Sequence, residues 1–244
     1  MKTWIPLWSI FWKDIKTYYL KPPNISWGII FPFAWALMFF IRSESAFDLR
    51  TILPGVVAMS ILFGSTSLLA VTITFEKRRG TFDRLLLAPV SLKLLMLAKT
   101  SGAILFGTIN AFVPIFVATA FIGLSGVALL PLLFGTILIA ISSTFLGLFI
   151  AVSVAEVFEA QTFSNFFRFP MVFLCGLFFP IDRLPVVLRP LSYILPLTYG
   201  ADILHGAVTH THSLPLWFDF VVLILFCGAL FLLSLRNVKK KWIV

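Results

Sequence analysis

Long apolar runs separated by short polar segments dominate the hydrophobic pattern of this chain. Six runs are long enough to cross the roughly 30 Å of hydrocarbon in a bilayer as helices. They cover residues 26–42, 52–75, 94–122, 127–154, 163–180 and 214–235, so that the first five lie within 26–180. The pattern predicts an all-α integral membrane protein, with six transmembrane helices in a single domain over residues 1–244.

Residues 1–22 show a different pattern, in which bulky apolar residues recur at helical spacing and charged residues lie off that stripe. The stripe consists of Trp4, Leu7, Trp8, Phe11, Trp12, Ile15 and Tyr18, and Pro22-Pro23 follows it. Such an amphipathic helix is suited to the membrane interface, with its basic side toward anionic lipid. An ordinary helix packed on the cytoplasmic ends of the bundle is the alternative.

The composition supports a membrane protein and excludes a soluble one. Of the 244 residues, 60% are hydrophobic and only 12% are charged, and the mean hydropathy is +1.03. Soluble domains carry about 25% charged residues, so the bilayer must solvate much of this apolar surface. Cys175 and Cys227 lie in apolar runs, where we expect free thiols rather than a disulfide. We also expect no cleaved signal peptide.

The net charge of +9 is distributed unevenly between the predicted connections. With the N-terminus in the cytoplasm, the cytoplasmic segments hold 14 of the 19 lysines and arginines, and the outer segments hold four. The positive-inside rule therefore predicts that both termini are cytoplasmic. Because orientation explains the basic surplus, we expect no nucleic-acid partner.

Residues 76–91, "EKRRGTFDRLLLAPVS", form a charged interruption between the second and third predicted spans. Gly80 allows a sharp change of direction, and Thr81 is expected to cap a short helix. Arg84 would turn away from an apolar face made of Phe82, Leu85, Leu86 and Pro89. The pattern predicts a rigid helix on the membrane surface, and a plain basic loop is the alternative.

Polar residues inside the apolar runs are candidates for a transport path, because such groups usually face a bundle interior. They are Ser60, Ser65, Thr66, Ser67, Thr72, Thr74, Asn110, Ser142, Ser143 and Thr144. Most hydroxyls of this kind bond to their own helix or to a neighbouring one. A contact with substrate is the alternative for any one of them.

Arg168 is the only charge well inside an apolar run, "FSNFFRFPMVFLCGLFFP". An arginine at the centre of a span costs about 2.5–3.5 kcal/mol, and each phenylalanine returns about 0.3–0.6 kcal/mol. Glu156 and Glu159, one helical turn apart in the preceding loop, are plausible counter-charges. We therefore interpret Arg168 either as a gate or substrate contact, or as part of a structural ion pair.

Prolines divide the outer segment, residues 181–213, into pieces that are too short to span the membrane. These pieces are predicted to be re-entrant helices that dip into the outer leaflet. His205, His210 and His212 lie nearby and could bind a metal, but a water-exposed loop explains them more simply. We therefore expect no metal site.

Two blocks of the sequence resemble the membrane subunits of ABC type-2 exporters, especially the branch that exports drugs and lipo-oligosaccharides. The first block contains Pro54-Gly55, Glu76, Arg79-Gly80-Thr81, Arg84-Leu85-Leu86 and Pro89. The second contains Gly176, Phe179-Pro180, Leu184-Pro185 and Pro196-Leu197-Thr198-Tyr199. With the six-span plan, the resemblance covers most of residues 50–206. The chain departs from the family pattern at Arg78, where a second acidic residue is common, and at Ala98-Lys99, where Gly-Lys is common.

The resemblance implies that residues 76–91 form a coupling helix, which docks in a groove of a separate ATPase subunit. The docking residues would be Glu76, Arg79, Gly80, Thr81, Phe82, Arg84, Leu85, Leu86 and Pro89. No glycine directly precedes a lysine, so this chain has no G-x-x-x-x-G-K-[ST] phosphate loop and is expected not to be an enzyme. ATP and Mg would be bound by the partner subunit.

The resemblance further implies a permease in the cell inner or plasma membrane, paired with a second copy of itself or with a paralogous permease. It would export a hydrophobic or amphipathic substrate such as a drug, lipid, glycolipid or polysaccharide, in contact with membrane lipids. The path or gate candidates are Arg168, Ser65, Thr66, Asn110, Glu156 and Glu159. The outer segment would cover the exit, with Phe179, Pro180, Leu184, Pro185, Pro196 and Tyr199 as its marker residues.

Three other functions were weighed. A haem-exporter type of permease would need a haem-ligating histidine in the path, and none of the three histidines lies in a predicted span. A membrane-embedded enzyme should show intramembrane clusters of His, Asp or Glu, which are absent from the span cores. A non-ABC membrane channel usually shows a charged ring or a carbonyl filter, and the sequence indicates neither.

Overall fold

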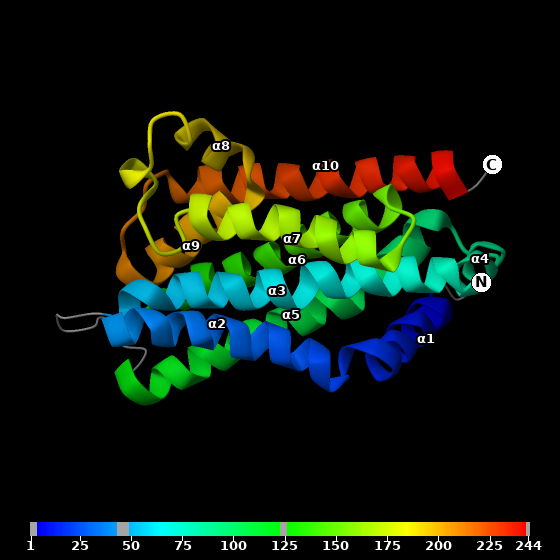
Figure 1. Ribbon diagram of the computed structural model, residues 1–244, viewed down its shortest axis with the longest axis horizontal. Helices are drawn as coiled ribbons and strands as arrows, with labels where there is room; N and C mark the ends of the chain where they lie inside the picture. Colours follow the sequence, from blue (N-terminus) through cyan, green and yellow to red (C-terminus); the bar gives the residue numbers. More distant parts are fainter. Residues whose placement is uncertain (1–3, 43–48, 123–125, 243–244) are drawn as a thin grey trace.

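The computed structural model describes residues 4–42, 49–122 and 126–242, and within these ranges the chain forms an elongated bundle of helices without strands (Figure 1). The α-helices are α1 (Trp4–Asp14), α2 (Pro22–Arg42), α3 (Leu49–Arg78), α4 (Thr81–Leu86), α5 (Leu92–Ile122), α6 (Leu129–Ser153), α7 (Val157–Leu174), α8 (Arg189–Ile194), α9 (Pro196–Thr209) and α10 (Leu216–Trp242). A π-helix, η1 (Ile15–Tyr19), follows α1, and a 3-10 turn, η2 (Ile181–Arg183), precedes α8. The all-α fold class is thus confirmed.

Helix α3 is the centre of the bundle. In its most apolar window 89% of the residues are buried, compared with 28% in α10, and α3 contacts α2, α5, α6, α7 and α9. Neighbouring segments approach α3 closely where a glycine on one side of the contact faces a backbone carbonyl on the other. A Cβ added to Gly147 of α6 would collide with the carbonyl oxygen of Thr66, and one added to Gly55 would collide with that of Leu177. Small residues at such contacts let helix backbones approach each other in a membrane.

Four of the six predicted spans are long and apolar enough to cross a membrane within the described residues. These are α3, α5, α6 and α10, which begin and end within a few residues of the predicted runs except that α10 extends to Trp242. The first predicted span falls within α2, which has 21 residues and includes the apolar stretch Gly28–Met38 among the residues that the structure describes. The fifth, predicted over 163–180, is wrong at its end: α7 stops at Leu174, and the chain turns at Gly176, where φ is +72°.

The two ends of the bundle are built differently. Both termini and α4 lie at one end, whereas η2, α8 and α9 lie at the other (Figure 1). This arrangement matches an even number of crossings. The membrane sides of the two ends, and the number of crossings, stay predictions.

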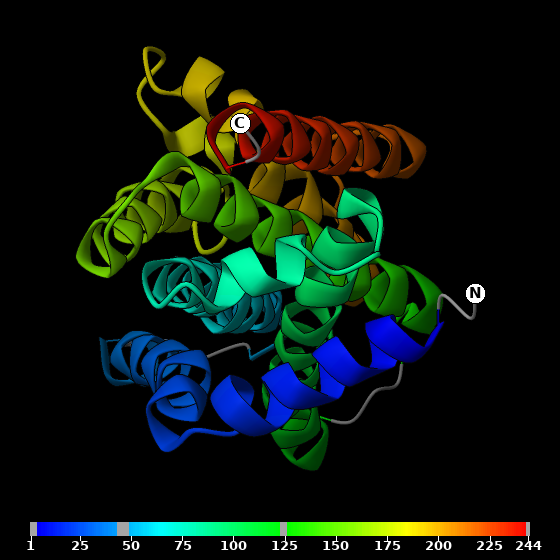
Figure 2. The ribbon, with the colours of Figure 1, turned by 90° about the vertical axis from the view of Figure 1, so that its right-hand side faces the viewer.

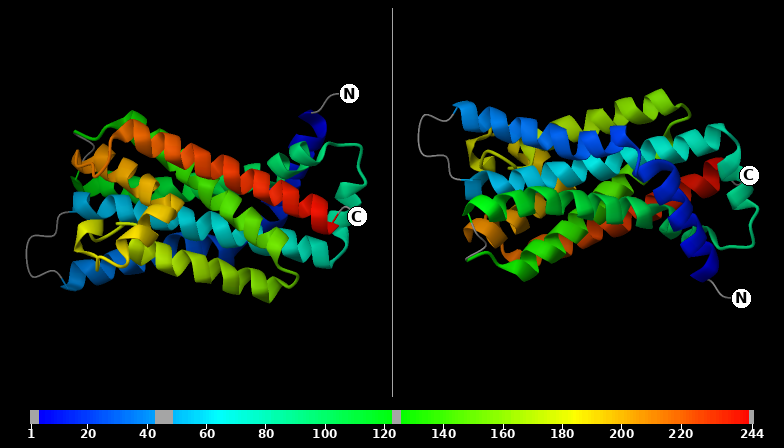
Figure 3. Two further views of the ribbon diagram at one scale, coloured as in Figure 1. Left: turned by 90° about the horizontal axis from the view of Figure 1, so that it is seen from above. Right: turned by 90° about the horizontal axis from the view of Figure 1, so that it is seen from below.

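Helix α1 lies obliquely across the α4 end of the bundle and packs against α5 (Figures 2 and 3). The indole of Trp8 is 61% exposed and that of Trp12 is 47% exposed, so this side of α1 is available to lipid. Asp14, expected off the apolar stripe, is instead buried. The helix therefore combines features of both predicted alternatives: it is packed on the bundle and it keeps aromatic side chains outside.

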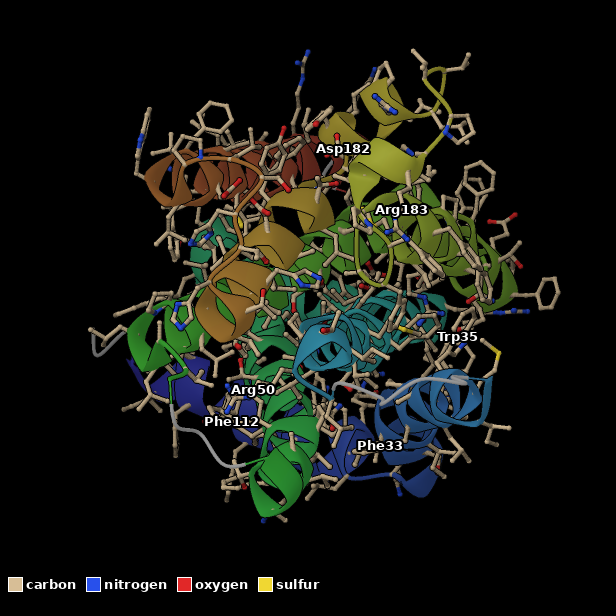
Figure 4. All side chains as sticks on the ribbon, turned by 90° about the vertical axis from the view of Figure 1, so that its left-hand side faces the viewer. Phe33, Trp35, Arg50, Phe112, Asp182 and Arg183 are labelled. Carbon is tan, nitrogen blue, oxygen red and sulfur yellow. The ribbon has the colours of Figure 1, made fainter. Side chains whose placement is uncertain are left out.

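Helix α9 lies among α3, α6 and α10 at the other end, as Figure 4 shows from that side. It has 14 residues, which gives a length of about 21 Å, too short to cross a bilayer. Pro196 at its first position suits a helix start, because that position needs no N–H partner. Asp182 and Arg183, labelled in Figure 4, belong to η2 and are exposed.

Candidate functional site

Helix α4 is a single short helix at the end of α3. Gly80 joins the two in the left-handed conformation, with φ of +69°, which favours glycine. The hydroxyl of Thr81 donates to the carbonyl oxygen of Glu76 at 3.0 Å, so Thr81 does not cap α4 as predicted. The predicted surface helix is thus shorter than residues 76–91, because α3 continues to Arg78.

The side chain of Phe82 holds α4 against the rest of the protein. It is 0% exposed, and its ring meets that of Trp242 edge-on with centroids 5.0 Å apart. Leu85 and Leu86 pack against the same cluster and are partly buried. The resemblance implies that Phe82 docks on the ATPase subunit, but in the structure its ring packs within the chain.

Glu76 was predicted to lie at the rim of the docking helix, and this is wrong. Its side chain is completely buried and forms ion pairs with Lys13 of α1 and Lys99 of α5. Lys99 is equally buried and places its Nζ atom 3.0 and 3.1 Å from the two carboxylate oxygens of Asp14. The four residues form an ion cluster that fastens α1 to α3 and α5, in which Lys13 is exposed and the other three are buried.

Lys13 and Lys99 each pair with both carboxylates, and only Lys99 is fully buried. Burial raises the pKa of the Asp14 carboxyl above its ordinary value, and the ammonium group of Lys99 opposes that rise. Removing one partner of a buried pair costs about 3–5 kcal/mol, because the remaining charge is left uncompensated. The cluster therefore fixes the position of α1 only while all its charges are present.

The surface that remains free at this end is small and mixed in character. We define the coupling surface as the exposed residues Arg79, Thr81, Arg84, Leu87 and Pro89. Leu87, directly after α4, is 85% exposed. An exposed leucine and two exposed arginines in one short segment can supply the apolar anchor and the charged rim that helix-in-groove docking uses.

Arg168 of α7 is 3% exposed and is not paired with either predicted counter-charge. Glu156 forms an ion pair with Arg78, and Glu159 accepts the backbone N–H groups of Ala155 and Glu156 in a capping box. The predicted ion pair of Arg168 is therefore wrong. Its two acidic candidates instead hold the start of α7 near the end of α3.

Arg168 lines a cavity of about 470 Å³ between α3 and α7, which also reaches the start of α2. We name it the α3–α7 cavity. Its polar and charged lining residues are Tyr18, Lys21, Ser67, Thr72, Gln161, Asn165 and Arg168, and its apolar ones include Phe63, Leu68, Val71, Phe75 and Phe169. The cavity borders α3 from its middle, at Phe63, to Phe75 near the end that leads to α4.

Ser67 and Thr72, two of the polar path candidates, line this cavity, whereas Ser65, Thr66 and Asn110 lie outside it. The hydroxyl of Ser65 donates to the carbonyl of Ile61 in its own helix, and that of Thr66 donates to the carbonyl of Ser143 in α6. Asn110 is buried between α2, α3 and α5, where its amide nitrogen, which has no hydrogen-bond partner, faces Gly28 and Gly64. These three residues therefore lie in contacts between helices.

The outer segment separates its predicted marker residues. Pro196 and Tyr199 are buried in α9, whereas Phe179, Pro180 and Pro185 are exposed, and Leu184 is intermediate. The hydroxyl of Tyr199 donates to the carbonyl of Tyr193 at 2.8 Å and closes the turn between α8 and α9.

Sequence reasoning missed the partners that complete the cavity and the ion cluster. Gln161 and Asn165 repeat at a helical interval before Arg168 and could have been grouped with it on one face of α7. Lys99 and Asp14 carried a weaker signal, since both are charged residues inside otherwise apolar helical patterns. The sequence gives no signal for the exposure of Leu87, because that exposure depends on where α4 ends.

Comparison with known proteins agrees with this architecture. The family described as ABC-2 type transporter matches residues 6–209. The chain is 27% identical over 201 residues to the probable multidrug ABC transporter permease YbhS of Escherichia coli K12, covering 82% of this chain and 53% of that one. It is 22% identical over 245 residues to the inner membrane transport permease YadH of the same organism, covering 97% and 96%. The chain thus spans about half the length of YbhS and nearly all of YadH.

The helical bundle and the apolar helices define a multi-pass membrane protein. The family match covers most of the chain, so it belongs to the ABC-2 type transporter family.

Proposed function

We propose that this permease forms part of an exporter that is driven by a separate ABC ATPase subunit, and that the ATPase docks on the coupling surface. The observation that carries the proposal is the position of Leu87, which is 85% exposed directly after α4, the helix that Phe82 anchors to the bundle. An exposed leucine on a fixed support can enter a groove of a partner without much loss of conformational entropy.

The chain itself supplies no phosphate loop, and ATP with Mg would be held by the partner. In this proposal six helices cross the membrane, with α2 and α7 completing the four longer spans. The α4 end faces the cytoplasm, as the charge distribution predicts. A second copy or a paralogous permease would complete the path for a hydrophobic or amphipathic substrate.

The proposal is tested by purifying the tagged chain from membranes of its native host in mild detergent. We expect an ATP-hydrolysing subunit to copurify, identified by mass spectrometry and by its own phosphate-loop sequence. Leu87→Glu should reduce the retained ATPase at least tenfold, because it places a carboxylate in the groove that receives the leucine.

Val187→Glu is the matched control, since Val187 is 83% exposed at the opposite end of the bundle. It should retain the ATPase at the level of the unaltered chain. Equal retention by Leu87→Glu and by Val187→Glu would overturn the docking proposal, provided that both variants elute as folded, monodisperse protein.

A further inference from the structure

The α3–α7 cavity carries positive charge without any acidic side chain in its lining. Arg168 and Lys21 both border it, and no aspartate or glutamate does among the residues that the structure describes. Only 3% of the surface of Arg168 is exposed. A buried charge of this kind is expensive unless it is paired, so an anion is the missing partner.

The hydrogen bonds of Arg168 leave part of its guanidinium group unused. It donates to the carbonyl of Ser164 at 3.3 Å, to that of Phe63 at 3.5 Å and to the side-chain oxygen of Asn165. A guanidinium group has five N–H donors, and these three acceptors are neutral. The carbon at its centre also lies 4.4 Å from the centroid of the Phe63 ring, so the group is held in one orientation.

A second polar group in the same cavity has no partner. The hydroxyl oxygen of Ser67 is buried and forms no hydrogen bond, although hydroxyls in a membrane helix normally bond to their own backbone. Ser67 and Arg168 come from different helices, α3 and α7, and border one cavity. Both supply donors, which is the set that a phosphate or carboxylate group requires.

The remaining walls of the cavity are apolar and aromatic. Phe63, Leu68, Val71, Phe75 and Phe169 provide surface that an inorganic anion would not use. The volume of about 470 Å³ lies within the range of about 300–1,000 Å³ that is common for small-molecule sites. The ligand should therefore have an apolar portion as well as an anionic head.

We propose that the α3–α7 cavity binds the anionic head group, phosphate or carboxylate, of an amphipathic molecule, with Arg168 as the counter-charge and Ser67 as an additional donor. The inference rests on the proposed function, because it names the substrate class of that transport path. It makes Arg168 a binding residue rather than a structural one.

The test measures binding to the purified full chain in neutral maltoside detergent, without ATPase or transport. Dodecyl phosphate is the anionic probe, dodecyl trimethylammonium is the cationic probe of the same chain length, and inorganic phosphate is the probe without an apolar portion. We expect saturable binding of dodecyl phosphate by calorimetry, at least tenfold tighter than that of either other probe. Equal binding of all three, or no saturable binding of dodecyl phosphate, would overturn the inference.

The variants separate charge from packing. Arg168→Gln should weaken dodecyl phosphate binding at least tenfold, Arg168→Lys should weaken it less than threefold, and Ser67→Ala should weaken it by a small factor. Arg183→Gln, an exposed arginine of η2 at the other end, is the matched control and should have no effect. If Arg168→Gln fails to fold, Arg168→Lys and Ser67→Ala still decide, because fully unchanged affinity in both variants would contradict a head-group site that uses these donors.

Two further arms identify the source of the head group and separate this inference from the docking proposal. In phosphatidylcholine nanodiscs, competition by added phosphatidylglycerol would assign the site to membrane phospholipid, and its absence would assign it to a single-chain anion; either result supports the site. Leu87→Glu should bind dodecyl phosphate normally even if it loses the ATPase. If the ATPase docks normally but dodecyl phosphate does not bind, only the inference about the α3–α7 cavity is refuted.

Discussion

The two ends of the bundle are stabilised by different interactions. At the α4 end, charged side chains pair with one another in the ion cluster and in the contacts of Lys77 with Asp83 and of Arg78 with Glu156. At the end that holds η2, α8 and α9, side chains bond mainly to the main chain. Asp202, for example, accepts the N–H groups of Ser213 and Leu214 at 2.9 Å.

The difference shows how each end responds to a change in its side chains. Ion pairs between segments far apart in the sequence fasten separate helices to each other, and each is lost when one charge is lost. Bonds from a side chain to a nearby backbone group shape one segment and leave its neighbours in place. We therefore expect large effects of single substitutions at the α4 end and moderate ones at the other end.

The largest effect is expected for Lys99→Met, which removes the ammonium group shared by Asp14 and Glu76. The two buried carboxylates would keep only the half-exposed Lys13 as a counter-charge, at a cost of about 3 kcal/mol in the free energy of unfolding. Thermal unfolding in detergent measures the loss. Lys93→Met on the same helix is the control, because Lys93 is exposed. Similar stability of the two variants would show that the ion cluster does not hold α1.

A moderate effect is expected for Gly55→Ala, which probes the other end. The added methyl group would collide with the carbonyl of Leu177 and with the ring of Phe178, and overpacking of this kind costs about 1–3 kcal/mol. Gly228→Ala is the control, since a Cβ on Gly228 of α10 meets nothing within 4 Å. The same unfolding assay should show a loss for the first variant and none for the second; equal results would mean that the segment after α7 is loosely attached to α3.

The smallest effect is expected for Tyr199→Phe, which removes one hydrogen bond to the carbonyl of Tyr193. Such a bond contributes about 0.5–1.5 kcal/mol, and the ring itself stays packed. Hydrogen exchange of the amides in α8 measures the effect more finely than global unfolding does. Faster exchange confined to α8 is the expected result, and a change spread over α10 would contradict a local role.

The sequence predicted the fold better than it predicted the site, and the reasons are physical. Helices α3, α5, α6 and α10 could be placed because each is an apolar run of more than 20 residues, which a bilayer allows only as a helix. The end of α7 could not be placed, since apolar residues continue beyond Gly176 although the backbone leaves the helix there.

The burial of Glu76 and Phe82 could not be predicted from local pattern. Lys99 and Asp14 are 85 residues apart, and Trp242 is farther still from Phe82 in the sequence. Such contacts arise only when the helices have been assembled. The family pattern singles out the segment that forms α4, but it does not say which of its side chains stay on the surface.

The contact between Phe82 and Trp242 determines how a displacement would spread. Helix α4 joins α3 through a short turn and α10 through this aromatic pair, and both α3 and α10 pack against α6. A force applied to α4 would therefore act on both α3 and α10. Because both helices pack against α6, we expect α3, α6 and α10 to tilt together. Relative sliding would then concentrate along the seam between α3 and α7.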